Sequence, residues 1–176
     1  MGISRERLLI YLGLLNDELT KINVRGELIF AEGASMCLAH DTDDASKDID
    51  ALYEPKKIVT TLASKIAIEQ NVSPNYLNEA AKGLAGSDIK EENFLNFSNL
   101  NIYAVTSEYL LCMKLMVSRY NTQDENDIKF LLKKLNITDK DKILELLLRY
   151  FKEEDILPKT TDTIMSLLED LDGGQT

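Results

Sequence analysis

At 176 residues the chain has the size of one ordinary domain, or of a core domain with a small appendage, and 44% of its residues are hydrophobic. The formal net charge of −10 argues against non-specific binding of DNA and against binding to an anionic membrane, because both depend on a positive field. A local basic groove for an RNA substrate stays open. The single histidine, His40, excludes a histidine-based metal site or catalytic triad.

The sequence gives no sign of a membrane span, of a secretory signal or of a redox-active cysteine pair. No stretch approaches the ~18 apolar residues of a membrane span, and residues 1–7 do not have the pattern of a secretory signal. Cys37 and Cys112 lie in apolar runs without CxxC spacing, which is typical of buried free thiols in a reducing compartment. We therefore expect a cytoplasmic protein without a membrane anchor.

The N-terminal segment predicts a helix followed by a strand. Apolar residues at spacings of three and four indicate an amphipathic helix over residues 4–22, capped by Ser4. Gly26 is expected to break this helix, and residues 28–31 are expected to form the first strand. A turn of small residues then leads into a short apolar helix over residues 36–38.

Two features next to this strand point to a phosphate and metal site. The turn Gly33-Ala34-Ser35 opens a helix, where backbone N–H groups can bind an anion such as phosphate. After an acidic loop over residues 40–47, Asp48 and Asp50 flank Ile49 in the second predicted strand. Side chains two residues apart on a strand point to the same face, so the two carboxylates can hold one or two divalent cations.

Each of these features also has a plain structural interpretation. Asp48 and Asp50 can be solvated acids at a strand edge. Gly33 can serve a tight turn only, and Ser35 can be a helix N-cap.

The middle of the chain predicts two helices and a strand. Pro55 is expected at the first position of a helix that runs to about residue 70. Ser73-Pro74 predicts the start of a second helix, through Ala80, that ends at Gly83 or Gly86. Residues 87–98 are expected to be irregular, and residues 100–105 alternate like a strand.

The C-terminal part predicts helices only. The expected elements are a buried helix over 108–120, a polar turn over 121–125, and helices over 127–135, from about 141 to 151 and over 161–171. Thr138-x-x-Asp141 is expected to cap the helix that starts at about residue 141, and Pro158 is expected to break that element.

Lys114 lies in a helix with almost no polar face. A buried ammonium needs an anionic partner or must reach the solvent. Lys114 can therefore serve a site, or it can pair with an acid such as Asp124 or Asp127. These two acids are also common at a helix start, where the dipole favours them.

The periodicities together predict an α+β protein with about three strands. We expect an α/β core with an N-terminal helix over residues 1–106 and a helical region packed on it over residues 107–176.

The motifs resemble those of the nucleotidyltransferases of the polymerase-β-like superfamily, in which a Gly-Ser or Gly-Gly turn is followed at a similar interval by Asp-x-Asp. More closely, the chain resembles the bacterial minimal nucleotidyltransferases of the DUF6036 kind, which are related to the AbiEii toxin family. The segments that carry this closer resemblance are Lys47–Ala51, Tyr76–Gly83, Glu108–Leu115 with Arg119, and Asp124-x-x-Asp127-Ile128.

The resemblance implies a small mixed sheet flanked by helices and a Mg²⁺-dependent (or Mn²⁺-dependent) transfer of a nucleotide from an NTP to a hydroxyl. It implies that Gly33, Ala34 and Ser35 hold the triphosphate and that Asp48 and Asp50 hold the metal. It further implies that Lys114 approaches phosphate or acceptor and that Asp124 and Asp127 act as a base or in a structural role. The acceptor class is an RNA, a protein or a small molecule, and a toxin–antitoxin or phage-defence system with a cognate partner is the implied context.

The chain departs from the family pattern in three places. Ala34 stands where a second Gly or a Ser is usual, and Asp41, Asp43 and Asp44 stand where relatives often carry a basic residue. Many active relatives carry a third carboxylate on a later strand. The corresponding strand predicted here, residues 100–105, offers only Asn101. A catalytically degenerate domain that binds a nucleotide or a protein is therefore the alternative. A purely structural helical adaptor is a third reading, which leaves the Asp pair and Lys114 unexplained.

Overall fold

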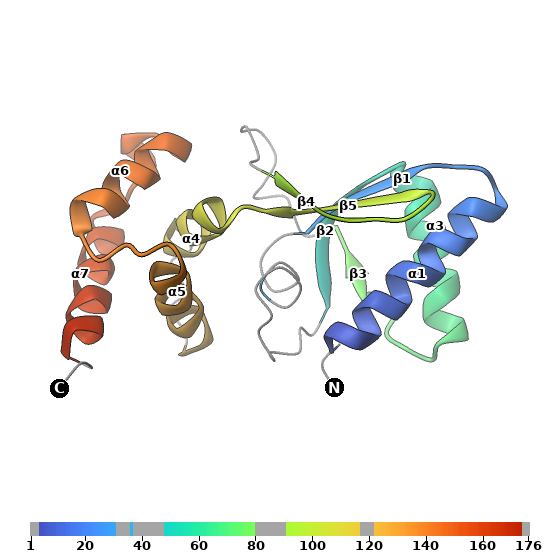
Figure 1. Cartoon of the computed structure of the whole chain (residues 1–176), viewed down its shortest axis with the longest axis horizontal. Helices are drawn as coiled ribbons and strands as arrows, with labels where there is room; N and C mark the ends of the chain where they lie inside the picture. The colour runs from blue at the N-terminus through green and yellow to red at the C-terminus, as the bar shows by residue number, and fades with distance from the viewer. Residues whose placement is uncertain (1–3, 31–35, 37–47, 80–90, 117–121, 174–176) are drawn as a thin grey trace. The chain divides into compact units, whose positions relative to one another are not determined.

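The computed structural model describes residues 4–30, 36, 48–79, 91–116 and 122–173. The chain divides into two compact units, Met1–Val105 and Thr106–Thr176. The first holds a sheet with two helices, and the second is helical (Figure 1). In the described ranges the protein is α+β, with a small mixed five-stranded sheet and six α-helices, which confirms the predicted fold class at this level.

The sheet has the strand order β3-β2-β1-β5-β4. β1 pairs antiparallel with β2 and parallel with β5, while β4 and β5 form an antiparallel hairpin and β2 and β3 run parallel. The strands are β1 (Gly26–Phe30), β2 (Ile49–Glu54), β3 (Leu77–Asn78), β4 (Glu91–Asn96) and β5 (Leu100–Val105).

Two of these strands were not predicted. The segment 87–98, expected to be irregular, contains β4, an edge strand whose sequence EENFLN lacks alternation and is rich in residues that strands disfavour. The helix expected after Ser73-Pro74 is wrong for residues 73–79, because these form a turn and then β3. The Ser73 hydroxyl accepts from the Asn75 N–H, so the residue expected to cap a helix closes a turn instead.

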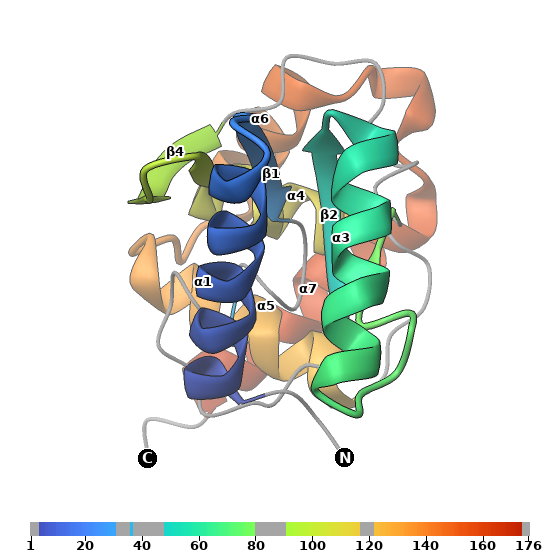
Figure 2. The same ribbon diagram turned by 90° about the vertical axis from the view of Figure 1, so that its right-hand side faces the viewer.

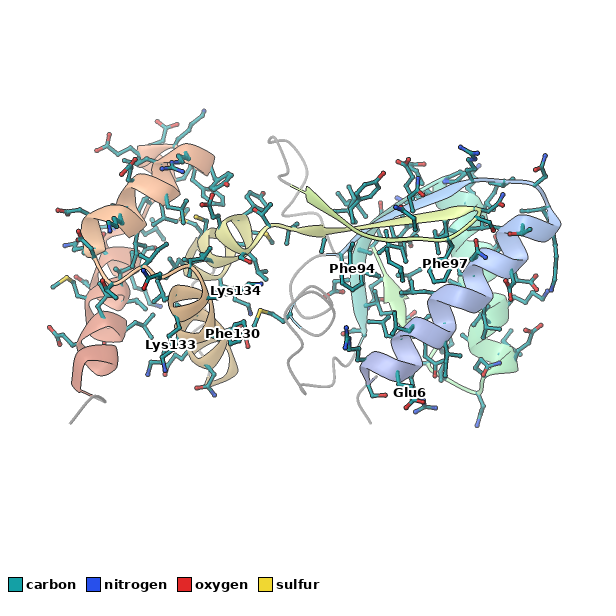
Figure 3. The ribbon with its side chains drawn as sticks, viewed as in Figure 1. Glu6, Phe94, Phe97, Phe130, Lys133 and Lys134 are labelled. Atoms are coloured by element: carbon teal, nitrogen blue, oxygen red, sulfur yellow. The ribbon has the colours of Figure 1, made fainter. Side chains whose placement is uncertain are left out.

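Helices α1 (Arg5–Lys21) and α3 (Lys56–Glu69) pack side by side against one face of the sheet, here called the helix face (Figure 2). The Ser4 hydroxyl accepts from the Arg7 N–H at 3.4 Å, as the predicted N-cap should. Pro55 is the N-cap of α3, one position earlier than predicted. Phe94 and Phe97 of the β4–β5 hairpin pack against this core (Figure 3). The core is formed by side chains such as Leu8, Leu15, Leu19, Leu28, Phe30, Val59, Ile66 and Ile102.

Gly26 starts β1 and does not end α1, which terminates at Lys21. A Cβ atom on Gly26 would lie 2.8 Å from Leu19 Cδ1 and 3.3 Å from Leu100 Cδ1, and both leucines are buried. The close approach of α1 and the sheet therefore explains the glycine.

Three helices end in the same way, on an asparagine with positive φ. Asn23, Asn71 and Asn136 have φ of 53–54°. The next residue is apolar in each case, and its N–H donates to the carbonyl five residues earlier, at 3.1 Å for Val24, 2.9 Å for Val72 and 2.9 Å for Ile137. This is the Schellman arrangement.

Replacing Asn71 by Ala is expected to destabilise the protein by about 1 kcal/mol. Alanine has a Cβ atom that clashes in the left-handed region and, unlike asparagine, no side-chain polar group that can form a local hydrogen bond there. Asn71→Gly should be neutral or stabilising. Urea denaturation measures both. Gln70→Ala is the matched control, since Gln70 has φ −91°. Equal stability of Asn71→Ala and the wild type would contradict the strain argument.

The second unit contains α4 (Ser107–Met116), α5 (Thr122–Lys134), α6 (Lys140–Tyr150), a 3-10 turn (Glu153–Asp155) and α7 (Pro158–Gly173). Three sequence-based boundaries were wrong. α5 begins at Thr122 and so includes Asp124; Asp139 rather than Thr138 caps α6, accepting from the Asp141 N–H at 2.9 Å; and Pro158 begins α7. Proline is well suited to that first position, which needs no N–H donor.

Cys112 lies in the core of this unit as a free thiol. Burial raises the pKa of Cys112 to about 12, so its thiol is a poor nucleophile at neutral pH. Cys37 and His40 lie outside the described residues. Among the helices that the structure describes, none is long and apolar enough to cross a bilayer.

Candidate functional site

Asp48 directly precedes β2, and Asp50 is its second residue. Ile49 and Ala51, which alternate with them, are 1% and 0% exposed and face the helices. Asp48 and Asp50 are half-buried. The alternation of strand side chains places Asp50 on the opposite face, here called the carboxylate face, while Asp48 lies in a bend one residue before the strand. Ile49 and Ala51 thus fix the direction of Asp50. Asp48 was expected inside the strand, but β2 begins one residue after it.

The register places this pair at the end of the sheet where β1 finishes. Phe30, the last residue of β1, is level with Ala51 of β2 and with Ala104 of β5. Because β1 and β5 run parallel, both strands finish at this end. Gly33, Ala34 and Ser35 themselves lie outside the described residues, so their contact with phosphate stays a prediction.

Asn78 of β3 is a site residue that the sequence reasoning missed. Its register partner is Asp50, and its side-chain Nδ2 donates to Asp48 Oδ2 at 2.8 Å. The backbone adds a second link, since the Ile49 N–H donates to the Tyr76 carbonyl at 2.7 Å. Asn78 was expected on a helix; the available signal was the Ser-Pro-Asn turn that precedes the short apolar pair Tyr76-Leu77.

The donor set fits a hard divalent cation. Mg²⁺ commonly takes one or two carboxylates and completes its coordination with water and substrate phosphates, so two aspartates suffice on the protein side. In the described part of the chain, no cluster of three or more His, Cys, Asp or Glu side chains has the geometry of a metal site. If a cation binds at this end of the sheet, Asp48 and Asp50 are the residues that would hold it.

β5 does not supply a third carboxylate. Ala104 is level with Ala51, so the residue of β5 level with Asp50 is Val105, which is 2% exposed. Asn101 is level with Glu27, at the other end of the sheet. Four residues along a strand separate Asn101 from Val105, or about 13 Å. Asn101 therefore does not complete the site.

Lys114, Asp124 and Asp127 come together within the helical unit. Lys114 is 8% exposed, and its Nζ lies 2.6 Å from Asp127 Oδ2 and 3.2 Å from Asp124 Oδ1. Burial alone would lower the pKa of Lys114, but the hydrogen bond and charge of Asp127 and the charge of Asp124 outweigh it and raise that pKa. Of the two predicted interpretations, pairing with these acids describes the observed contacts.

The predicted site residues thus fall into two groups. Asp48 and Asp50 belong to the sheet unit, and Lys114, Asp124 and Asp127 form an ion cluster in the helical unit. The carboxylates of the first group can ligate a cation. The second group holds a buried positive charge in place.

Comparison of the chain with protein-family models, with curated proteins and with solved structures finds no match.

Proposed function

We propose that the sheet unit is a nucleotidyltransferase-type domain that binds an NTP with Mg²⁺ or Mn²⁺ at Asp48 and Asp50 and transfers the NMP to a hydroxyl. The observation that carries this proposal is the position of the two carboxylates at the end of the sheet where β1 finishes, where Asn78 contacts Asp48 and pairs with Asp50. The mixed sheet and the motif resemblance support it.

Each residue has a defined task in this proposal. Asp48 and Asp50 hold the cation, and the Asn78 amide orients Asp48 through its hydrogen bond. When bound, the cation neutralises phosphate charge and orients an in-line displacement. Ile49 and Ala51 anchor the strand in the core, so that the carboxylates are positioned before substrate arrives.

The acceptor and the biological context are proposed on the resemblance alone. An RNA, a protein or a small molecule with a free hydroxyl is the acceptor class. A toxin–antitoxin or phage-defence system with a cognate partner protein is the context, and the cytoplasm is the compartment.

A domain that binds a nucleotide or a protein without turnover is the second candidate. Val105 favours it, because a buried apolar residue occupies the position on β5 that is level with Asp50. In its nucleotide-binding form, this candidate shares the cation and nucleotide site with the enzyme and differs from it in whether phosphate chemistry follows.

Thermal melts in the presence of MgCl₂ and each of the four NTPs test the nucleotide site. A ligand at 100 times its Kd stabilises the folded state by about 2.7 kcal/mol, so at least one NTP is expected to raise Tm by several degrees. EDTA should abolish the shift. Absence of a shift with every NTP would remove the enzyme and the nucleotide-binding module, and would leave only a protein-binding domain.

Transfer assays separate the two candidates. With α-³²P-labelled NTPs, the enzyme is expected to label tRNA, a protein or itself and to release pyrophosphate. A nucleotide-dependent rise in Tm without pyrophosphate release or label transfer would leave the binding module.

A further inference from the structure

Beyond Asp50, the carboxylate face of the sheet is organised in rows that the strand register defines. The first row holds Asp50 and Asn78. The second row is apolar, with one residue from each of three adjacent strands, and the third is polar. The second row is Leu52, Ile29 and Tyr103, and the third is Glu54, Glu27 and Asn101.

The dimensions of these rows suit an extended nucleotide. Successive rows are two residues apart, or about 7 Å, so the polar row lies about 13 Å from Asp50. Leu52, Ile29 and Tyr103 are half-buried, whereas Glu27 and Glu54 are exposed. A ligand whose phosphates are at the Asp50 end and whose base points along the sheet would therefore meet first an apolar and then a polar surface.

The polar row breaks a rule of strand pairing. Glu27 and Glu54 are direct cross-strand partners on the same face, where like charges are destabilising. Neither carboxylate forms an ion pair with another described residue, although Glu54 accepts from the Lys56 N–H at 3.1 Å. Local conflicts of this kind are found at functional sites, and here a ligand with a hydrogen-bond donor would relieve the repulsion.

We propose that this face binds the nucleobase of the NTP, that Tyr103 stacks on the base, and that Glu27 and Glu54 select a base with an exocyclic amino group. The inference rests on the proposed function, because the phosphates are assigned to the Asp48 and Asp50 end. Tyrosine offers a flat ring for stacking. A carboxylate accepts from an amino group and repels a carbonyl oxygen, so cytosine is preferred to uracil, which carries a carbonyl at the same position.

Calorimetric titration with CTP, UTP and inorganic tripolyphosphate, each with Mg²⁺, tests this proposal. CTP is expected to bind about tenfold or more tightly than UTP. Tyr103→Leu should weaken CTP binding between about fivefold and a hundredfold, while tripolyphosphate binding stays unchanged. Tyr103→Phe should bind CTP like the wild type, and the double variant Glu27→Gln/Glu54→Gln should lose the preference for CTP.

Tyr53→Leu is the matched control, because Tyr53 is a half-buried strand tyrosine level with Leu28 on the helix face. It should leave CTP binding unchanged. If Mg²⁺-tripolyphosphate binds but CTP and UTP bind equally, the base site is refuted and the phosphate site stands. If neither CTP nor tripolyphosphate binds, the proposed function fails and this inference fails with it. The comparison of CTP with UTP uses the wild-type protein, so it still tests the base site if Tyr103→Leu does not fold.

Discussion

Asp127→Ala is expected to lower the free energy of unfolding of the helical unit by about 1.5–3 kcal/mol, because it removes the nearest hydrogen-bonded partner of the buried Lys114 ammonium. Both side chains are 8–10% exposed, and their atoms are 2.6 Å apart. Asp124 remains 3.2 Å from Lys114, but at 27% exposure it is the weaker partner. Urea denaturation followed by far-UV circular dichroism measures the loss.

Two further variants separate the cost of an unpaired buried charge from the loss of an ordinary ion pair. In Lys114→Met/Asp127→Leu both charges are replaced by apolar groups, so most of the stability should return. Glu145→Ala breaks an ion pair in which Arg149 is 56% exposed, Glu145 is 70% exposed and their atoms are 3.2 Å apart. Its loss should lower the free energy of unfolding by less than about 0.5 kcal/mol. If Asp127→Ala costs no more than Glu145→Ala, the cluster does not hold the helices together.

The same cluster predicts a dependence on alkaline pH. The pKa of Lys114 is raised above its ordinary value of 10.5, so its contribution to stability is fully present below pH 10.5. It is lost as the pH rises through the folded-state pKa, because only the ammonium pairs with the two carboxylates. Relative to wild type, Lys114→Met/Asp127→Leu should therefore lose less stability above pH 10.5.

The strongly patterned parts of the chain were predictable from the sequence, because their periodicity and caps agree with their packing. α1, with its Ser4 cap, and β5 have the predicted type and nearly the predicted bounds. Asp50 lies on the face of β2 opposite to Ile49 and Ala51 because the period of a strand is two. Such features need only local physics.

The elements that the sequence did not reveal depend on pairing with distant segments. β4 has a polar sequence and is a strand because it pairs with β5. The turn at Ser73 and strand β3 use residues that also suit a helix start, and only the pairing of Asn78 with Asp50 decides between them. The contact from Asn78 to Asp48 was unpredictable for the same reason. Tertiary context overrides local propensity where the local signal is short.

The role of Lys114 was left open by the sequence for a different reason. An amphipathic pattern shows that a lysine is misplaced in an apolar helix, but it does not show which anion lies beside it. Asp124 was expected in a turn and Asp127 at a helix start, whereas α5 carries both. Placing them on one helix brings both carboxylates within 3.2 Å of Lys114 Nζ.

Asp50→Asn is expected to reduce the rate of nucleotide transfer by about a thousandfold or more while leaving the fold intact. The amide is nearly isosteric with the carboxylate, and the site is half-buried, so the melting temperature without ligand should change little. A neutral amide is a poor ligand for Mg²⁺, and metal stabilisation of phosphoryl charge is worth several kcal/mol. Each 1.36 kcal/mol corresponds to a factor of ten in rate.

Asp48→Asn tests the second carboxylate of the site, and Asp162→Asn is the control. Asn at position 48 can still accept from the Asn78 amide, so it removes charge but keeps the strand contact, and it should reduce transfer as strongly as Asp50→Asn. Asp162 is an exposed aspartate of α7, and its replacement should leave transfer unchanged. Pyrophosphate release provides a readout that does not depend on the acceptor. Wild-type transfer rates in both Asp48→Asn and Asp50→Asn would locate the chemistry elsewhere in the chain, because a metal site built on these two carboxylates cannot work without their charge.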